Sequence, residues 1–154
     1  MADPSPSDPS ASDARPVIRL LALREEPLDV TEVLEAVSDP RAGAVDVFVG
    51  AVRDHDNAQG VTGLDYSAHP SAVDRLREVA EGIVAEHDVL ALAGVHRTGS
   101  LAIGDLAVVC AVATAHRGEA FAATEAFIDR LKESVPIWKH QRFTDGTDEW
   151  VGTP

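Results

Sequence analysis

The chain has 154 residues, 45% of them hydrophobic and 25% charged, a composition typical of a globular protein with one core. Its net charge of −13 argues against nucleic-acid binding, because phosphate backbones require a basic surface. No apolar run reaches the roughly 18 residues of a membrane span, and the N-terminus lacks the pattern of a secretory signal. The single cysteine, Cys110, cannot form an internal disulfide and agrees with a reducing compartment. We therefore expect a cytoplasmic protein that binds neither nucleic acid nor membranes.

The first fifteen residues differ from the rest in composition. Residues 1–15 are mostly Pro, Ser, Asp and Ala, with no large apolar side chain after Met1. Such a segment cannot offset the entropy cost of ordering, so we expect a disordered tail. Residues 16–154 contain no linker, repeat or low-complexity stretch, and we expect them to form one domain.

The hydrophobic pattern of residues 16–154 predicts both strands and helices. Apolar runs between turn residues predict strands at 17–23, 44–53, 61–69, 89–95, 106–114 and 137–143. Helices are predicted at 29–38, 71–87 and 119–134. The first is opened by Asp29 and Glu32, which resemble a capping box, and Ser71 is a candidate cap for the second.

The short connections favour an α+β domain with a largely antiparallel sheet and about three helices. We expect Val73 and Phe121 on the buried faces of their helices, and residues 54–60 and 99–104 in loops and turns.

Lysine is unusually rare in this chain. Of the 13 basic residues, 11 are arginine, and only Lys132 and Lys139 are lysine, seven residues apart on either side of Pro136. A lysine amine can act as a base or nucleophile when it is desolvated, whereas arginine stays charged. The two lysines are therefore candidate catalytic residues, although two neighbouring surface lysines can also arise by chance.

Two His-Arg pairs follow predicted strands. His116 and Arg117 also open the third predicted helix, where free N–H groups and the helix dipole favour anions, so we expect them to bind an anionic group. We expect His96 to pack at a strand end and Arg97 to pair with a surface carboxylate. Arg53 ends a strand beside a polar loop, where it can reach into a pocket or neutralise a nearby aspartate.

Motifs for the common cofactors and metals are missing from the sequence. The histidines lack the spacing of a metal site, and there is no paired C-x-x-C, Gly-rich phosphate loop, Rossmann fingerprint or nucleophile elbow. We expect neither a metal nor a cofactor.

Five segments, in their order and spacing, resemble molybdopterin synthase large subunits. They are FVGAVRDHDNAQGV (48–61), HRTGSLAIGD (96–105), AHRGEAF (115–121), IDRLKESVPIWKHQ (128–141) and DGTDEWV (145–151). The Pro-Ile-Trp-Lys element after a helical Leu-Lys is the most specific, followed by His-Arg-x-x-Ala-Phe. The resemblance runs from about residue 43 to 151, which is most of the expected domain.

The resemblance implies an enzyme that converts cyclic pyranopterin monophosphate into the dithiolene-bearing molybdopterin. It implies a homodimer flanked by two copies of a small ubiquitin-like subunit, whose Gly-Gly end carries a thiocarboxylate and enters a pocket of the large subunit. By resemblance Lys132 and Lys139 are the catalytic lysines, and Arg53, His116 and Arg117 bind or orient the phosphorylated substrate.

The chain departs from the family pattern in three places. Gln141 stands where family members often carry glutamate, residues 65–69 read DYSAH in place of an aromatic and acidic run, and the chain ends at Pro154 where the family continues with charged residues. A substrate contact from that extension is then either missing or replaced, and Arg142 is a candidate replacement. A non-catalytic anion-binding or assembly module of the same fold is therefore an alternative, as is a lysine-dependent enzyme acting on another phosphorylated metabolite.

The predicted third helix separates two groups of candidate residues. His116 and Lys132 are 16 residues apart, or roughly 24 Å at about 1.5 Å per residue. One small substrate cannot touch both within a single subunit. If both serve one substrate, we expect a dimer in which each subunit contributes to its neighbour's site.

Overall fold

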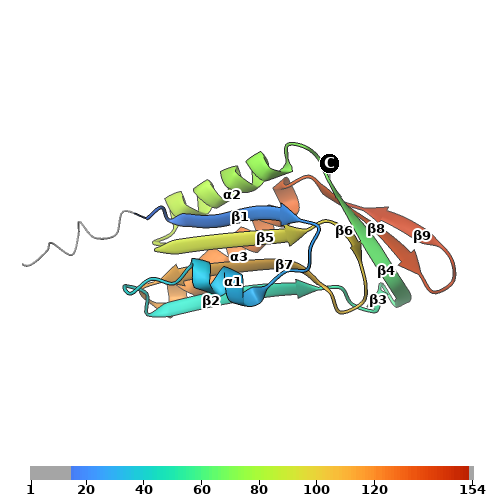
Figure 1. Ribbon diagram of the computed structural model, residues 1–154, viewed down its shortest axis with the longest axis horizontal. Helices are drawn as coiled ribbons and strands as arrows, with labels where there is room; N and C mark the ends of the chain where they lie inside the picture. Colours follow the sequence, from blue (N-terminus) through green and yellow to red (C-terminus); the bar gives the residue numbers. More distant parts are fainter. Residues whose placement is uncertain (1–14, 153–154) are drawn as a thin grey trace, which may run out of the picture.

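Two β-sheets and three α-helices make up residues 15–152, the part of the chain that the computed structural model describes (Figure 1). The tail expected at residues 1–15 lies outside this range, except for Arg15. The helices are α1 (Val30–Ala36), α2 (Ala72–Glu86) and α3 (Arg117–Ser134). The strands are β1 (Ile18–Arg24), β2 (Ala44–Ala51), β3 (His55–Asp56), β4 (Gln59–Ala68), β5 (Ala91–Arg97), β6 (Gly99–Leu101), β7 (Leu106–Thr114), β8 (Ile137–Phe143) and β9 (Asp148–Val151). The three predicted helices and six predicted strands are confirmed. Within residues 15–152, no helix is long and apolar enough to cross a membrane.

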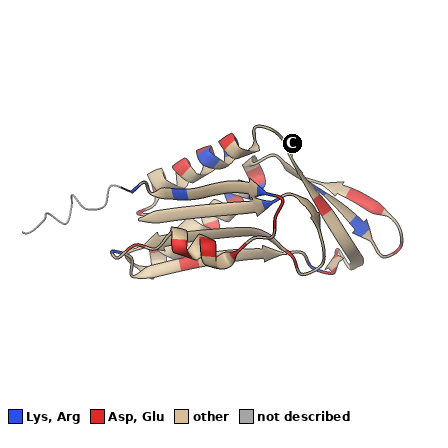
Figure 2. Ribbon diagram, in the orientation of Figure 1, with Lys and Arg blue, Asp and Glu red and all other residues tan. Residues whose placement is uncertain are grey.

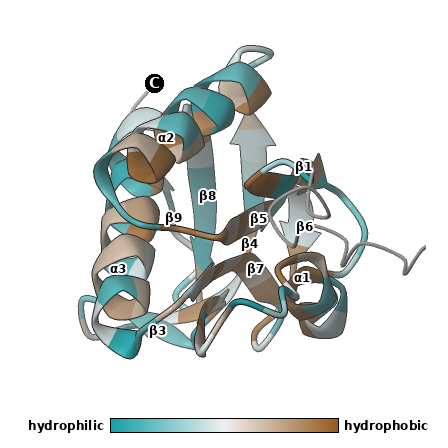
Figure 3. Ribbon diagram, turned by 90° about the vertical axis from the view of Figure 1, so that its left-hand side faces the viewer, coloured by the Kyte–Doolittle hydropathy of each residue, from teal (hydrophilic) through white to brown (hydrophobic). Residues whose placement is uncertain are grey.

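The first sheet is the middle layer of a three-layer core. Its strand order is β1-β5-β7-β2, with β1 parallel to β5 and the other pairs antiparallel. Helices α2 and α3 pack on one face and α1 on the other, so the apolar strands β5 and β7 lie between them (Figure 3). Burial on both faces explains why these strands read as nearly continuous apolar runs.

The second sheet extends from one end of the first (Figure 1). Its order is β3-β4-β8-β9, with β6 also pairing to β4, and all its pairs are antiparallel. The α+β class and the largely antiparallel pairing are confirmed, but the strands divide between two sheets. Strands β3 and β6 form within segments expected to be loops, because β4 offers both of them a pairing edge.

Some local expectations were wrong. Ser71 makes no capping bond with its side chain, and its Oγ lies 2.8 Å from His69 Nδ1. Phe121 is 59% exposed and Val73 is also exposed, because the buried stripe of each helix is set by the side that meets the sheet. Asp29 does cap α1, by accepting a bond from Thr31 N–H at 2.9 Å, but the Glu32 carboxylate accepts bonds from Arg24 and does not complete a capping box.

Helix α3 packs closely on the first sheet at one point. Phe127 is fully buried, and a Cβ placed on Gly94 of β5 would lie 2.8 Å from its ring. Glycine at position 94 therefore lets the aromatic ring rest directly on the strand. This contact fixes the height and axial position of α3 above the sheet, and with it the end of the helix that carries Lys132.

We predict that Gly94→Ala lowers the free energy of unfolding by about 1–3 kcal/mol, because the added methyl group overpacks the contact with Phe127. Urea denaturation measures the change. The double variant Gly94→Ala, Phe127→Leu should lose less than the sum of the two single variants, because leucine leaves room for the methyl group. Gly118→Ala is the control, since a Cβ there meets nothing within 4 Å. Additive losses in the double variant would contradict the proposed contact.

Candidate active site

The two lysines of the sequence meet in one cavity at the junction of the two sheets. The cavity has a volume of about 180 Å³ and is lined by Tyr66, His96, Leu131, Lys132, Val135, Ile137, Lys139, Val151 and Gly152. Lys132 lies in the last turn of α3, and Lys139 lies on β8. Pro136 lies between the helix and the strand, so the chain turns there and brings residues seven apart to one cavity.

Strands on both sides of β8 complete the walls around Lys139. In the register of the second sheet, Lys139 is opposite Tyr66 of β4 and Val151 of β9. Gly152 follows β9 with a φ of +137°, and a Cβ there would lie 2.8 Å from the Ile137 carbonyl oxygen. The end of β9 is therefore pressed against the start of β8, and glycine permits both the close approach and the backbone conformation.

His96 also lines this cavity, which the sequence analysis missed. The residue is 8% exposed, and Nδ1 lies 2.7 Å from the Arg97 carbonyl oxygen. Burial lowers the pKa of His96 to about 4; the bond to Arg97 opposes this shift and the charge of Lys132 adds to it. The imidazole is therefore neutral near pH 7. Arg97 pairs with Asp105 at 3.1 Å, which confirms the expected surface ion pair.

Tyr66 of β4 packs against the His96 ring. The two ring centroids are 4.9 Å apart with an interplanar angle of 85°, an edge-to-face contact. Burial raises the pKa of Tyr66, so its hydroxyl keeps its proton near neutral pH. The cavity thus combines two amines, a neutral imidazole and a neutral phenol with apolar walls.

Arg53 reaches the neighbourhood of Lys139 through an aspartate. Arg53 Nη2 lies 3.4 Å from Asp56 Oδ1, and Gln141 Nε2 donates to Asp56 Oδ2 at 2.8 Å. The Gln141 bond, and then the charges of Lys139 and Arg53, lower the pKa of Asp56. Asp56, on strand β3 of the second sheet, therefore places a carboxylate beside the neutral amide of Gln141.

His116 and Arg117 are not brought to this cavity within the subunit. His116 is the N-cap of α3 without a side-chain capping bond, and Arg117 is its first residue. The helix places them roughly 22 Å or more from Lys132 at its opposite end. The helix expected to separate the two groups is confirmed, and His116, Arg117 and Lys132 are exposed at its two ends.

Other candidate groups belong to the scaffold. Cys110 is fully buried, and burial raises its pKa to about 12, so it is a core residue as expected. Arg142 pairs with Asp65 and lines a separate cavity. No cluster of three or more potential metal ligands occurs within residues 15–152.

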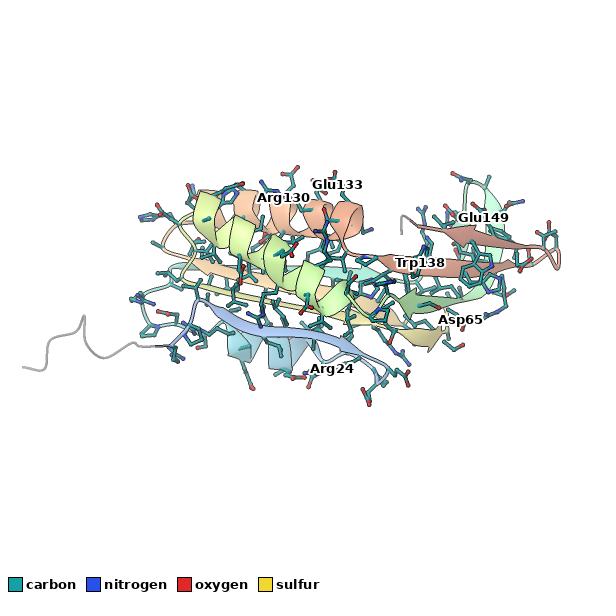
Figure 4. The ribbon with its side chains drawn as sticks, turned by 90° about the horizontal axis from the view of Figure 1, so that it is seen from above. Arg24, Asp65, Arg130, Glu133, Trp138 and Glu149 are labelled. Atoms are coloured by element: carbon teal, nitrogen blue, oxygen red, sulfur yellow. The ribbon has the colours of Figure 1, made fainter. Side chains whose placement is uncertain are left out.

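The cavity contrasts in charge with its surroundings. Acidic residues are frequent along α1 and α2 (Figure 2), whereas two cations meet at the cavity. Figure 4 shows that Arg130 and Glu133, which flank Lys132 on α3, project away from the first sheet, and Trp138 lies at the passage from α3 to the second sheet. Such a site suits an anionic group and can stabilise negative charge that develops during a reaction.

Comparisons with known proteins agree on one family. Residues 23–134 match the family described as MoaE protein. The chain is 43% identical over 150 residues to molybdopterin synthase catalytic subunit 1 of Mycobacterium tuberculosis, covering 92% of this chain and 95% of the relative. It is 38% identical over 132 residues to the catalytic subunit of Halalkalibacterium halodurans, covering 85% and 84%.

Solved structures share the fold. The crystal structure of molybdopterin synthase from Staphylococcus aureus matches with a TM-score of 0.78 and 34% identity, covering 85% of this chain and 96% of that chain. A complex of subunits 1 and 2 of the molybdopterin-converting factor from Helicobacter pylori matches with a TM-score of 0.67 and 25% identity, covering 86% and 89%. On this evidence, the chain belongs to the MoaE family of molybdopterin synthase catalytic subunits, enzymes of molybdenum cofactor biosynthesis.

Proposed function

We propose that this chain transfers sulfur from the thiocarboxylated C-terminus of a small ubiquitin-like subunit to cyclic pyranopterin monophosphate. The observation that carries the proposal is that the only two lysines of the sequence line one cavity. The relatives named above are catalytic subunits of molybdopterin synthase, which supports the same reaction class. Reconstitution with a thiocarboxylated small subunit and the cyclic pterin, followed by an assay for the dithiolene product, tests it. A chain that binds both but yields no product would instead be a non-catalytic assembly module.

The groups in the cavity suit this chemistry. The sulfur of the thiocarboxylate forms a bond to a pterin carbon, and water then attacks the acyl carbon, so that the acyl carbon–sulfur bond breaks, the sulfur stays on the pterin and the small subunit leaves as a carboxylate. Negative charge develops on the acyl oxygen and on the sulfur in that cleavage, and an ammonium group nearby stabilises both. Addition of sulfur to the pterin carbons also requires proton transfers, which a lysine amine can serve. We assign these roles to Lys132 and Lys139 together.

We further propose that the site is completed by a second copy of the chain. The cavity of about 180 Å³ is smaller than the roughly 300 Å³ at which ligand sites begin. His116 and Arg117 lie at the far end of α3 from Lys132. Val45 and Val49 on the edge strand β2 are exposed, and they supply apolar contacts for a two-fold dimer. In such a dimer the neighbour's His116 and Arg117 would bind the substrate phosphate, and Arg53 would approach from the connection between β2 and β3 of the chain itself.

The small subunit must dock on an acidic protein. A net charge of −13 repels an acidic partner at long range, so docking must rest on apolar contacts and on capture of the partner's extended tail. The solved Helicobacter pylori complex of subunits 1 and 2 supports assembly with a second, different subunit.

We predict that Lys132→Ala and Lys139→Ala each reduce sulfur transfer by at least about 100-fold, because each removes a cation or proton carrier from the reacting groups. Turnover of the reconstituted enzyme measures the loss, and circular dichroism checks the fold. Arg130→Ala is the matched control, because it removes a cation from the outer side of the same helix, where Arg130 pairs with Glu86. Near-normal turnover in a folded lysine variant would remove that lysine from the assignment.

A mixing experiment tests the shared site. We predict that inactive Arg117→Ala and inactive Lys132→Ala chains recover about a quarter of the normal activity after 1:1 exchange, because half of the dimers are mixed and each of these has one wild-type site of two. Mixing Lys132→Ala with Lys139→Ala is the control, since both lysines come from the same chain and no wild-type site can form. Continued inactivity of the first mixture after verified exchange would place all the residues within one subunit.

Removal of the terminal Gly-Gly from the small subunit separates tail capture from surface docking. We predict that catalysis is abolished while the dissociation constant, measured by isothermal titration calorimetry, rises only modestly, because the globular surfaces still meet. Complete loss of binding would show that the tail is the main contact.

A further inference from the structure

His96 is placed opposite the end of α3 by the alternation of strand β5. Leu92 and Gly94 of β5 face the helices, since Leu92 belongs to their core cluster and Gly94 meets Phe127 of α3. His96 is the next residue on that face. One helical turn beyond Phe127 come Leu131 and Lys132, and both line the cavity with His96.

The ring nitrogens of His96 have different environments. A carbonyl oxygen can only accept, so the contact at 2.7 Å means that Nδ1 carries the proton and donates it to Arg97. Nε2 of the neutral ring then holds a lone pair. Within residues 15–152, no fully enclosed side-chain nitrogen or oxygen lacks a hydrogen-bond partner. His96 bonds only through Nδ1, so its Nε2 has no partner and cannot be fully enclosed. Because His96 lines the cavity, we infer that Nε2 is open to it.

The surroundings keep this acceptor neutral and fixed. The titratable groups that share the cavity are Tyr66 from β4, Lys132 from α3 and Lys139 from β8. Burial and the charge of Lys132 both disfavour the imidazolium form, and the Tyr66 ring packs edge-to-face with the imidazole. A lysine amine on a four-carbon stem is mobile, whereas His96 lies on a central strand of the first sheet.

We propose that His96 is a positioning residue for Lys132: its open Nε2 accepts a hydrogen bond when the Lys132 amine turns into the cavity they share, and this bond directs the amine at the reacting atoms. The effect on turnover rests on the proposed sulfur transfer, but the hydrogen bond itself does not. A bond between a charged amine and a fixed neutral acceptor is strong, and it restricts the rotamers of the lysine. Lys139, on another element, does not depend on it.

The rarity of lysine permits a direct test on the isolated chain. Limited modification by trinitrobenzenesulfonate, read by peptide mass spectrometry, reports Lys132 and Lys139 separately, with Lys139 as the internal standard. His96→Asn keeps a donor for the Arg97 carbonyl and removes the nitrogen that faces the cavity. We expect the ratio of Lys132 to Lys139 labelling to rise about tenfold, because the Lys132 amine is no longer held by a hydrogen bond and is free to reach the reagent. His96→Gln, which restores a polar atom near Nε2, should bring the ratio back toward the wild type.

Two further variants exclude a purely structural effect. His96→Phe keeps the ring volume and the contact with Tyr66 but has no acceptor, so it should behave like His96→Asn. His69→Asn is the control, because His69 also bonds locally through Nδ1 but lines a separate cavity. Melting temperatures verify the fold of each variant. An unchanged ratio in folded His96→Asn or His96→Phe, or equal changes at both lysines, would overturn the proposal.

In the reconstituted enzyme, His96→Asn should lower kcat by about 10- to 100-fold with KM changed less than about twofold, since positioning acts on the reacting amine and not on uniform substrate binding. His96→Gln should recover part of kcat. An unchanged kcat would overturn the role in turnover. If the wild-type chain transfers no sulfur but the labelling ratio responds as expected, the proposed function fails while the hydrogen bond between His96 and Lys132 stands.

Discussion

The contact between Phe127 and Gly94 sets the position of α3, and the cavity depends on that position. Because interiors are close-packed, a shift of the helix cannot be absorbed by empty space and would be transmitted along its axis. Lys132 lies on the same helix little more than one turn beyond Phe127, and His96 lies on the same strand two residues beyond Gly94. One packing contact therefore sets the spacing between the strand and the helix on which two of the polar groups of the cavity lie.

The second sheet supplies the remaining walls of the cavity. Helix α3 ends just before Pro136, and the chain then crosses from the layer over the first sheet into the middle of the second sheet, where β8 is flanked by β4 and β9. The cavity is thus built between two sheets rather than within either. This origin accounts for its mixed character, with apolar residues from the core, one lysine from the last turn of α3 and the other from β8.

Charge is arranged differently in the two parts of the candidate site. Around Lys139, the carboxylate of Asp56 pairs with the Arg53 guanidinium and accepts a hydrogen bond from the neutral Gln141 amide. Around Lys132, the neighbours are a neutral imidazole and aliphatic side chains. The phosphate-binding groups that the family resemblance implies at His116 and Arg117 stand apart at the other end of α3, which is why we propose that a second subunit completes the site.

The sequence by itself determined the helices, the longer strands, the α+β class and the two lysines, because each is a local pattern of period, turn residue or composition. Only the tertiary structure decided which sides of the helices are buried, so Phe121 was misplaced, and that the strands form two sheets. It also decided that His96 and Lys132 line one cavity and that Asp56 bonds Gln141, 85 residues away in the chain. Such contacts depend on how strands pair and helices pack over long separations, and this information is not contained in the local spacing of residues.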